Sequence, residues 1–318
     1  MTVAIAIVLG AALTLVLVGA GVFWETIVRT DRSDHNYDGV SDETAFLPSG
    51  GTDYRIVAAA GNIWWNKQPL ERIVIKSDDG LLLVGHILRA PAPSRGLAFV
   101  AHGHQCVSGE MGFIAQMYID RGLDVFIADQ RAHGKSGGRF IGMGLPESRD
   151  MLRWLPAALE KAGQPKNVVL HGISMGAETV MLMSAQPLPE CVRCAVEDCG
   201  YSTAYGAILN VVRKSYRAVP FKVIAVEIAS IINRLVCGFS FRDIAAVRAV
   251  EKSAVPMLFI HGDADRTVPV QMVYELYDAC TAPKELLIVG GATHGVSYFQ
   301  NPELYKKTVF EFEDKYFV

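Results

Sequence analysis

The sequence lacks an excess of charge of either sign. Its 318 residues include 30 Lys and Arg against 33 Asp and Glu, for a formal net charge of -3. Such a chain has no basic field with which to bind a phosphate backbone, so we expect no nucleic-acid partner. Charged residues make up only 20% of the chain and hydrophobic residues 51%. This composition argues against disorder and leaves enough apolar surface for a sizeable core.

Cysteine is infrequent, and internal repeats and low-complexity segments are missing. A chain of this length does not need disulfides, and the cysteine spacing suggests no disulfide framework. Cys191, Cys194 and Cys199 could be a fragment of a zinc site, but no second pair or nearby His completes four ligands. We therefore expect reduced thiols, no metal and no organic cofactor. The six cysteines are Cys106, Cys191, Cys194, Cys199, Cys237 and Cys280.

One long hydrophobic run occupies residues 3–24, which contain no charge. At about 1.5 Å per residue it could cross roughly 30 Å of hydrocarbon. We predict an uncleaved membrane anchor over residues 1–28. A cleaved signal peptide is the alternative, because Val18-Gly19-Ala20 offers small residues for cleavage, but the basic segment that begins a signal peptide is missing.

A polar segment follows the hydrophobic run. Residues 29–53 contain many turn formers and few apolar residues, so we interpret residues 29–69 as a tether and lead-in. Arg29 and Arg32 follow the run, whereas no Lys or Arg precedes it. For a single-pass protein, this asymmetry weakly favours a cytoplasmic C-terminal part, but it does not decide the membrane face.

Short apolar runs alternate with helical patterns from residue 70 onward. Residues 72–76 and 81–89 flank the turn Ser77-Asp78-Asp79-Gly80, which predicts an antiparallel hairpin. Later runs suit strands buried on both faces, and the intervening helices suit right-handed crossovers. We predict a doubly wound, mostly parallel α/β sheet over residues 70–318, with functional groups at the carboxyl ends of its strands. The later runs are 97–101, 125–129, 168–171, 194–198, 257–261 and 285–289.

One interval interrupts this alternation. Nearly sixty residues, 199–256, separate two of the predicted strands and include the apolar segments 208–212 and 223–236. We interpret residues 200–250, approximately, as an inserted helical cap over the carboxyl edge of the sheet. Its apolar positions either pack onto the domain, which is the default expectation, or line a pocket for an acyl group.

Two segments match the G-x-S-x-G pattern of serine nucleophiles, one around Ser174 and one around Ser136. The chemistry needs a serine on a tight turn between a strand and a helix, where flanking glycines relieve crowding. Ser174 has this context, because VVLH precedes its motif and helix formers follow it. Ser136 lies in a polar loop, and Asp129 stands where a phosphate loop would have its first glycine. We predict Ser174 as the nucleophile, with a structural turn serine as the alternative.

A serine hydroxyl also needs a general base and a group that orients the base. Among eight histidines, His294 lies in a glycine-containing loop after the last predicted strand, and we predict it as the base. His171 and His261 end predicted strands and are expected to fill space.

Three carboxylates are candidates for the orienting acid. Asp263 and Asp265 follow the predicted strand 257–261. Asp198 ends the strand after the nucleophile helix, where a capping or hinge role fits as well. The residues by themselves leave this choice open.

Together these segments resemble the α/β-hydrolase superfamily, in particular its membrane-anchored, esterase-like or prolyl-oligopeptidase-like members. The resemblance covers about residues 70–318, and the chain order Ser, Asp, His is the order that this fold uses. The landmarks are His102-Gly103-His104, the segment 129–136, the segment 172–176, the segment 261–269 and His294-Gly295.

The resemblance adds three residue roles. It implies Asp265 as the acid, because this Asp stands three residues before Val268-Pro269. It implies that the backbone N–H groups of His104 and Met175 form the oxyanion hole. It also assigns the segment 129–136 to structure. The side chain of His104 is expected to face solvent rather than substrate.

These observations predict a serine hydrolase that cleaves carboxylic esters through an acyl-enzyme, using Ser174, His294 and Asp265. An apolar cap and a membrane anchor suggest acylglycerol or lysolipid substrates. A peptidase or amidase of the prolyl-oligopeptidase-like group is the enzymatic alternative. A non-catalytic binding module is the other class, but such proteins commonly lose part of the triad.

Overall fold

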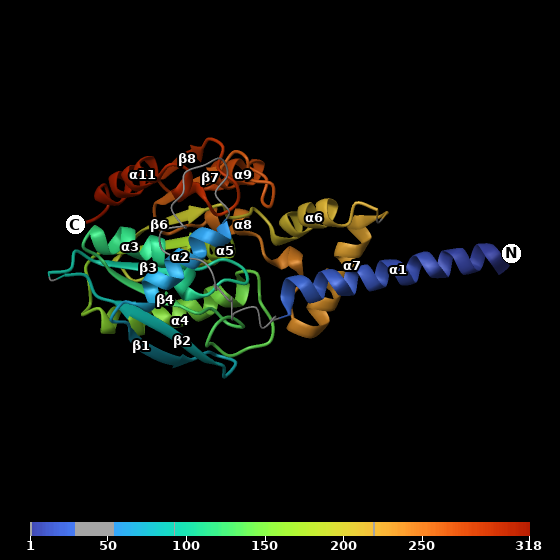
Figure 1. Ribbon diagram of the computed structural model, residues 1–318, viewed down its shortest axis with the longest axis horizontal. Coiled ribbons are helices and arrows are strands. Elements are labelled where there is room, and N and C mark those ends of the chain that lie inside the picture. The colour runs from blue at the N-terminus through green and yellow to red at the C-terminus, as the bar shows by residue number, and fades with distance from the viewer. Residues whose placement is uncertain (1, 29–53, 92, 219) are drawn as a thin grey trace.

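In the computed structural model, eight strands form a single sheet with helices on both faces (Figure 1). The structure describes residues 2–28, 54–91, 93–218 and 220–318, so the predicted tether over 29–53 lies outside the described residues. The strand order is β1-β2-β4-β3-β5-β6-β7-β8. The strands are β1 (Glu71–Lys76), β2 (Leu82–Leu88), β3 (Leu97–Ala101), β4 (Asp124–Ala128), β5 (Val168–Ile173), β6 (Val192–Asp198), β7 (Met257–Gly262) and β8 (Lys284–Val289).

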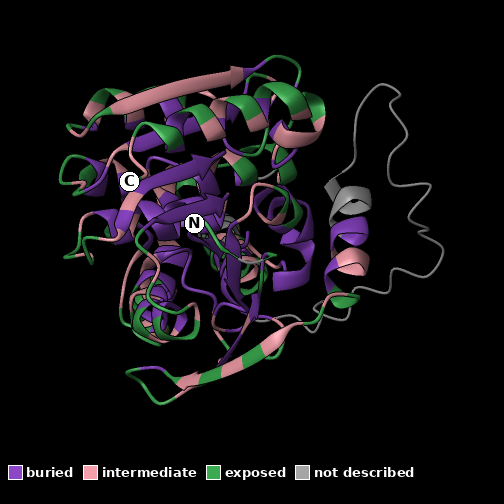
Figure 2. Cartoon of the chain, turned by 90° about the vertical axis from the view of Figure 1, so that its left-hand side faces the viewer, coloured by how far each residue is buried: buried purple, intermediate pink, exposed green. Residues whose placement is uncertain are grey.

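The pairing directions confirm the predicted mostly parallel sheet with an antiparallel start. β2 runs antiparallel to both β1 and β4, and every other neighbouring pair is parallel. β3, β4, β5 and β7 are buried along their whole length, which explains their largely apolar sequences. The edge strand β1 instead alternates between half-buried and exposed residues, as the banded strand in Figure 2 shows.

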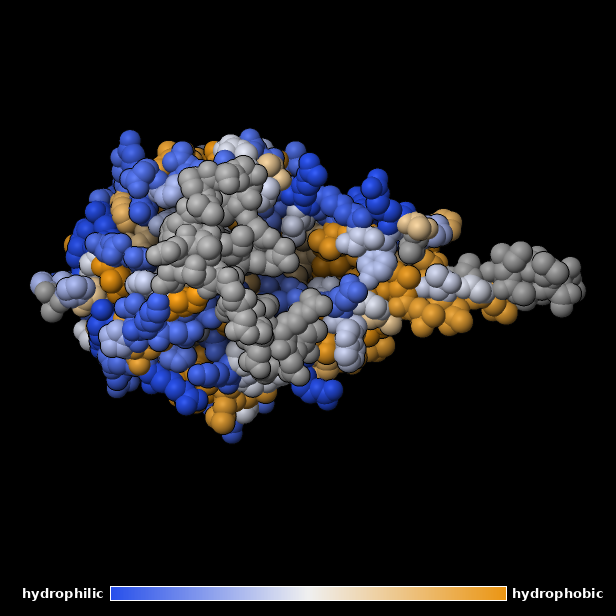
Figure 3. Space-filling view, viewed as in Figure 1, coloured by the Kyte–Doolittle hydropathy of each residue, from blue (hydrophilic) through white to orange (hydrophobic). Residues whose placement is uncertain are grey.

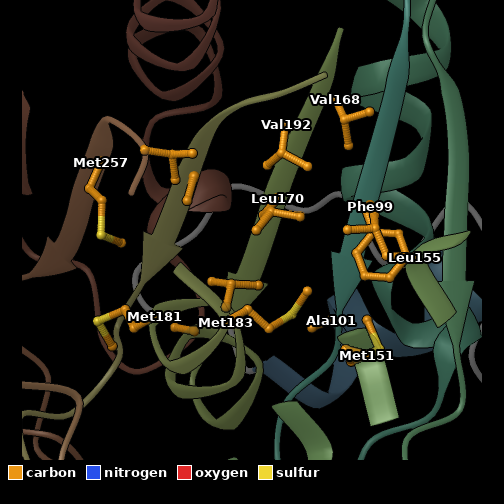
Figure 4. Packing of buried hydrophobic residues seen from close by; sticks show 14 of the residues in the cluster. Phe99, Ala101, Met151, Leu155, Val168, Leu170, Met181, Met183, Val192 and Met257 are labelled. Atoms are coloured by element: carbon orange, nitrogen blue, oxygen red, sulfur yellow. The ribbon is translucent and has the colours of Figure 1, made fainter. Parts of the chain in front are cut away.

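Two apolar layers hold the helices against the sheet. Successive side chains of a strand point to opposite faces, so Phe99 of β3 lies in one layer and Val100 in the other. The first layer contains residues of α4, α5, α8 and α9, and Figure 4 shows it around Leu170. The second contains residues of α2, α3 and α11. These helices are α2 (Tyr54–Asn66), α3 (Gly112–Asp120), α4 (Leu145–Lys161), α5 (Met175–Ser184), α8 (Ala246–Val250), α9 (Gln271–Ala279) and α11 (Pro302–Asp314).

Helix α2 was not anticipated in the lead-in segment. Its Trp65 is 1% exposed and belongs to the second apolar layer. A side chain on Gly112 would place its Cβ 2.0 Å from the carbonyl oxygen of Gly61, so the two glycines allow the backbones to meet. The end of the lead-in is therefore part of the domain rather than of a tether.

The interval predicted as a cap begins with two helices, α6 (Ala204–Ser215) and α7 (Lys222–Cys237). They share a third apolar cluster with the C-terminal part of α1 (Thr2–Ile27). A Cβ on Gly19 of α1 would lie 2.7 Å from the side chain of Ile228, so this glycine permits close packing of α1 on α7. The N-terminal part of α1 projects away from the body of the molecule (Figure 1).

Within the described residues, no single helix combines the length and apolar character needed to cross a membrane. The apolar stretch Ala12–Ile27 is shorter than a membrane-spanning helix. The segments Lys222–Cys237 and Phe241–Val250 reach the required length and apolar character only together, and the chain bends by 85° between them. The predicted transmembrane anchor stays a prediction.

The remaining short helices lie in the connections of the domain. They are the 3₁₀ helices η2 (Ser108–Met111) and η3 (Phe241–Asp243) and the α-helix α10 (Ser297–Gln300).

Candidate active site

Ser174 occupies a sharp turn between β5 and α5. Its backbone has φ 56° and ψ -117°, a conformation that is unfavourable for a residue with a side chain. The flanking glycines make the turn possible. A Cβ on Gly172 would lie 2.1 Å from the carbonyl oxygen of Gly176, and one on Gly176 would lie 2.0 Å from that of Ala101. The motif is therefore required by close backbone contacts as well as by its serine.

A continuous chain of hydrogen bonds links the three predicted triad residues. Ser174 Oγ lies 2.8 Å from His294 Nε2, and His294 Nδ1 lies 2.6 Å from Asp265 Oδ2. A carboxylate only accepts, so Nδ1 carries the proton and Nε2 is free to accept the serine hydroxyl. The structure thus brings together, in the required tautomer, side chains that follow three different strands.

Asp265 is held in its ionised form. Its Oδ1 accepts the backbone N–H groups of Thr267 and Val268, at 2.8 and 2.9 Å. Burial acts to raise the pKa of this carboxyl, but hydrogen bonds from His261, His294 and the Val268 N–H outweigh it and bring the pKa well below its ordinary value. A permanent negative charge therefore faces the imidazole of His294.

His261 supports Asp265, a role that the sequence interpretation missed. Its Nε2 donates to the carbonyl of Val268 at 3.0 Å and lies 3.5 Å from Asp265 Oδ2. Burial acts to lower the pKa of His261, but the neighbouring carboxylate raises it overall. The spacing of four residues between His261 and Asp265, across the turn after a strand, was the available signal. By contrast, His171 is fully buried between two tyrosine hydroxyls, and burial lowers its pKa to about 3.

The other two candidate acids contact different partners. Asp263 accepts the backbone N–H of Gly291 at 2.7 Å and so braces the loop that leads to His294. Asp198 accepts the hydroxyl of Ser297 at 2.8 Å, and burial raises its pKa to about 6. The hydrogen bond from His294 goes to Asp265.

Ser136 has a structural environment. Its hydroxyl donates to the carbonyl of Asp129 and accepts the N–H of Val84 at 2.8 Å. The Asp129 carboxylate accepts the N–H groups of Ser108 and Lys135, each at 2.9 Å. The segment 129–136 therefore joins neighbouring loops, as its resemblance to the superfamily implied.

His104 and Met175, the predicted oxyanion-hole residues, line the same cavity as Ser174 and His294. The expectation that the His104 side chain faces solvent is wrong. Its Nε2 donates to the backbone carbonyl of Thr26 at 2.7 Å, at the end of α1. Burial under that helix lowers the pKa of His104, so the ring is neutral and carries its proton on Nε2.

The cavity above Ser174 has a volume of about 720 Å³ and mostly apolar walls. Ile208 and Val212 of α6 form one side, and Val22 and Trp24 of α1 form another. Some apolar positions of the cap therefore line a pocket, while others, such as Val226, pack within the third cluster.

Among the described residues, one group could in principle ligate a metal ion. It consists of Cys199, Asp265 and His294, whose ligand atoms lie within 4.8 Å of one another. Asp265 and His294 already share a 2.6 Å hydrogen bond, so an ion between them would break the chain to Ser174. We assign the group to the triad.

Comparison with known proteins identifies similar families and a similar fold. A family model described as "Serine aminopeptidase, S33" matches residues 92–197, and one described as "Serine hydrolase (FSH1)" matches residues 231–296. The esterase Pf2001 of Pyrococcus furiosus superposes with a TM-score of 0.63 over 85% of this chain and 97% of that one, at 21% identity. The chain has the α/β-hydrolase fold, and separate parts of it match two families of serine hydrolases. The two family matches include Ser174 in the first and Asp265 with His294 in the second, which supports a hydrolase of the serine type.

Two relatives of this hydrolase add detail. The uncharacterized protein YqkD of Bacillus subtilis is 30% identical over 198 residues, which cover 62% of the hydrolase and 64% of the relative. The chain thus spans slightly less than two thirds of that protein's length. A monoacylglycerol lipase of Mycolicibacterium smegmatis is 26% identical over 70% of the hydrolase and 89% of its own length.

Proposed function

We propose that this α/β hydrolase cleaves carboxylic esters through an acyl-enzyme. The observation that carries the proposal is the hydrogen-bonded chain from Ser174 through His294 to Asp265, which opens into an apolar cavity. Ser174 Oγ attacks the ester carbonyl while His294 Nε2 takes the hydroxyl proton. His294 then donates this proton to the departing alkoxide. Water, deprotonated by His294, attacks the acyl-enzyme and releases the acid.

The negative charge that develops on the carbonyl oxygen needs hydrogen-bond donors. We assign this task to the backbone N–H groups of Met175, the first residue of α5, and His104, in the loop after β3. Asp265 stabilises the positive charge that His294 gains in each step.

The cavity supports an acyl ester as substrate. Its volume suits a small lipid, and its apolar walls from α1 and α6 suit an alkyl chain. We therefore propose monoacylglycerols or lysolipids as the substrate class, a choice supported by the similarity to a monoacylglycerol lipase.

Aminopeptidase activity is the second candidate, favoured by one residue. Glu25 is the only acidic side chain among the described residues that line the cavity, and an acid there could bind a substrate amino group. The hydroxyl of Tyr216 already donates to Glu25 Oε2 at 3.0 Å, and the rest of the lining is mostly apolar. These features favour the ester.

A panel of substrates separates the two activities. Each buried methylene contributes about 0.8 kcal/mol, so the six methylenes by which octanoyl exceeds acetyl could raise kcat/KM by up to roughly a thousandfold if all were buried. We expect an octanoyl ester of p-nitrophenol to exceed the acetyl ester by at least about tenfold in kcat/KM. Aminoacyl and dipeptidyl p-nitroanilides, tested beside them, should be poor substrates. Preference for the acetyl ester contradicts the lipid assignment, and faster turnover of the anilides contradicts the ester assignment.

We propose further that α1 anchors the protein in a membrane as a single span. Arg29 and Arg32 follow the span, and this position of positive charge favours a cytoplasmic hydrolase domain. Large exposed apolar side chains gather on α1 and on the neighbouring α7. They contribute to the orange surface around these two helices in Figure 3. The packing of Gly19 against Ile228 supports a helix that is retained rather than cleaved after Ala20. The exposed residues are Leu9, Leu13, Val16, Leu17 and Trp24 on α1 and Val223, Ile224, Ile231, Leu235 and Val236 on α7.

Carbonate extraction of membranes from producing cells tests the anchor. We expect the full chain to stay in the membrane pellet with its first residues intact by mass spectrometry. The double variant Leu13→Arg/Leu17→Arg should lose this behaviour, because arginine near the centre of a span costs about 2.5–3.5 kcal/mol. Leu82→Arg is the matched control, since Leu82 is 63% exposed, as is Leu17, but lies on β2. Wild-type protein that carbonate releases, or that begins near residue 21, contradicts the anchor.

A further inference from the structure

The last turn of α1 is bonded directly to the hydrolase domain. The final carbonyls of a helix have no partner within the helix, so other groups must satisfy them. Here three successive carbonyls each accept a hydrogen bond from a group more than 70 residues away in sequence. The donors are Gln105 Nε2 to Glu25 O at 3.1 Å, His104 Nε2 to Thr26 O at 2.7 Å, and Ile141 N to Ile27 O at 2.6 Å.

Two of these donors lie in the loop that carries the proposed oxyanion N–H of His104. The loop is strained, because Gln105 has a φ of 55°. It is also held from its other side. His133 Nδ1 donates to the carbonyl of Arg131, so its Nε2 accepts the backbone N–H of Gln105 at 3.0 Å. The loop is thus fixed between the segment 129–136 and the end of α1.

The C-terminal end of α1 forms a wall of the cavity. Val22, Trp24, Glu25 and Thr26 all line it together with Ser174. The bond from Tyr216 to Glu25 ties this wall to the end of α6. The helix end therefore touches both the substrate cavity and the loop that completes the catalytic machinery.

We propose that the last turn of α1 is a positioning element of the active site. The Thr26 carbonyl holds the imidazole of His104, and this bond keeps the backbone N–H of His104 where the oxyanion forms. The inference rests on the proposed hydrolase function and goes beyond it, because the N-terminal helix then serves catalysis as well as attachment. Its physical basis is that an oxyanion donor acts only within hydrogen-bond distance, so a small shift of the loop weakens it.

Replacing the imidazole without changing the backbone tests the proposal in the full-length, detergent-solubilised protein. His104→Phe fills a similar volume but cannot donate to the Thr26 carbonyl. We expect kcat for p-nitrophenyl octanoate to fall at least about tenfold while KM changes less than about threefold, because the oxyanion contact strengthens in the transition state. His104→Gln, whose amide can donate to the same carbonyl, should recover most of the lost kcat. His86→Phe, on β2, is the matched control and should keep wild-type kcat.

A second variant covers the case in which His104→Phe does not fold. Gln105→Met removes the bond to the Glu25 carbonyl and loosens the same loop, so the same loss of kcat at nearly constant KM is expected. Wild-type kcat in whichever variant folds overturns the proposal, and so does a loss that appears only in KM or that His104→Gln fails to recover. Ser174→Ala in the same assay distinguishes failure of this inference from failure of the hydrolase proposal. An inactive Ser174→Ala beside a fully active His104→Phe overturns only this inference, whereas an active Ser174→Ala overturns the hydrolase proposal itself.

Discussion

Replacing Ser174 with alanine is expected to lower kcat for ester hydrolysis by about 10⁴ to 10⁶, the range found when a catalytic serine or its base is removed from a triad. The hydroxyl oxygen is the atom that forms the acyl-enzyme, and no neighbouring group can replace it in the hydrogen bond to His294 Nε2. Alanine fits the turn, because it keeps the Cβ that Ser174 already carries at its φ of 56°. The melting temperature should therefore change little.

Covalent labelling checks this result independently of the substrate. A fluorophosphonate probe should label the wild-type protein at Ser174, as located by peptide mapping, and should not label Ser174→Ala.

Ser136→Ala is the control for the second G-x-S-x-G segment. Ser136→Ala leaves the N–H of Val84 without its acceptor, so it should reduce stability by about 1–3 kcal/mol and still be labelled. Loss of label in Ser136→Ala at a temperature where it is folded, or wild-type turnover by Ser174→Ala, contradicts the assignment.

Asp265→Asn is expected to lower kcat by about 10⁴, by analogy with the same change in other triads. The carboxylate lies 2.6 Å from His294 Nδ1 and fixes the proton on that nitrogen. An asparagine amide can donate to Nδ1 instead, which leaves the proton on Nε2, where it blocks transfer from Ser174. The variant also removes the negative charge that stabilises the imidazolium. KM should change much less than kcat.

Asp263→Asn is the matched control, two residues away in the same turn. Asp263 accepts the N–H of Gly291, and an asparagine oxygen can accept the same bond, so kcat should stay within about threefold of wild type. Equal losses in Asp263→Asn and Asp265→Asn would indicate that the loop, rather than the charge on Asp265, is responsible.

Local sequence patterns determined the elements that carry the site. The apolar runs predicted the buried strands because a strand covered on both faces consists mainly of apolar residues. The Gly172 to Gly176 segment predicted its turn because strand, serine and helix are contiguous in sequence. The predicted run 194–198 began two residues late relative to β6 at Val192, since Arg193 interrupts its apolar pattern.

The tertiary structure decided the choices that depend on distance. The residues alone left Asp198, Asp263 and Asp265 open, because all three lie at the carboxyl ends of strands, on the same edge of the sheet. The fold decides that His294 reaches the carboxylate of Asp265.

The unexpected contacts have the same explanation. The sequence interpretation missed the support that His261 gives to Asp265 and the bond from His104 to Thr26. Thr26 and His104 are 78 residues apart, and their contact exists because α1 packs on α7 and ends beside the loop after β3. Periodicity and motifs encode elements, which form from neighbouring residues. Partnerships between distant side chains follow from how those elements pack, and here that packing gives the N-terminal helix a place in the proposed active site.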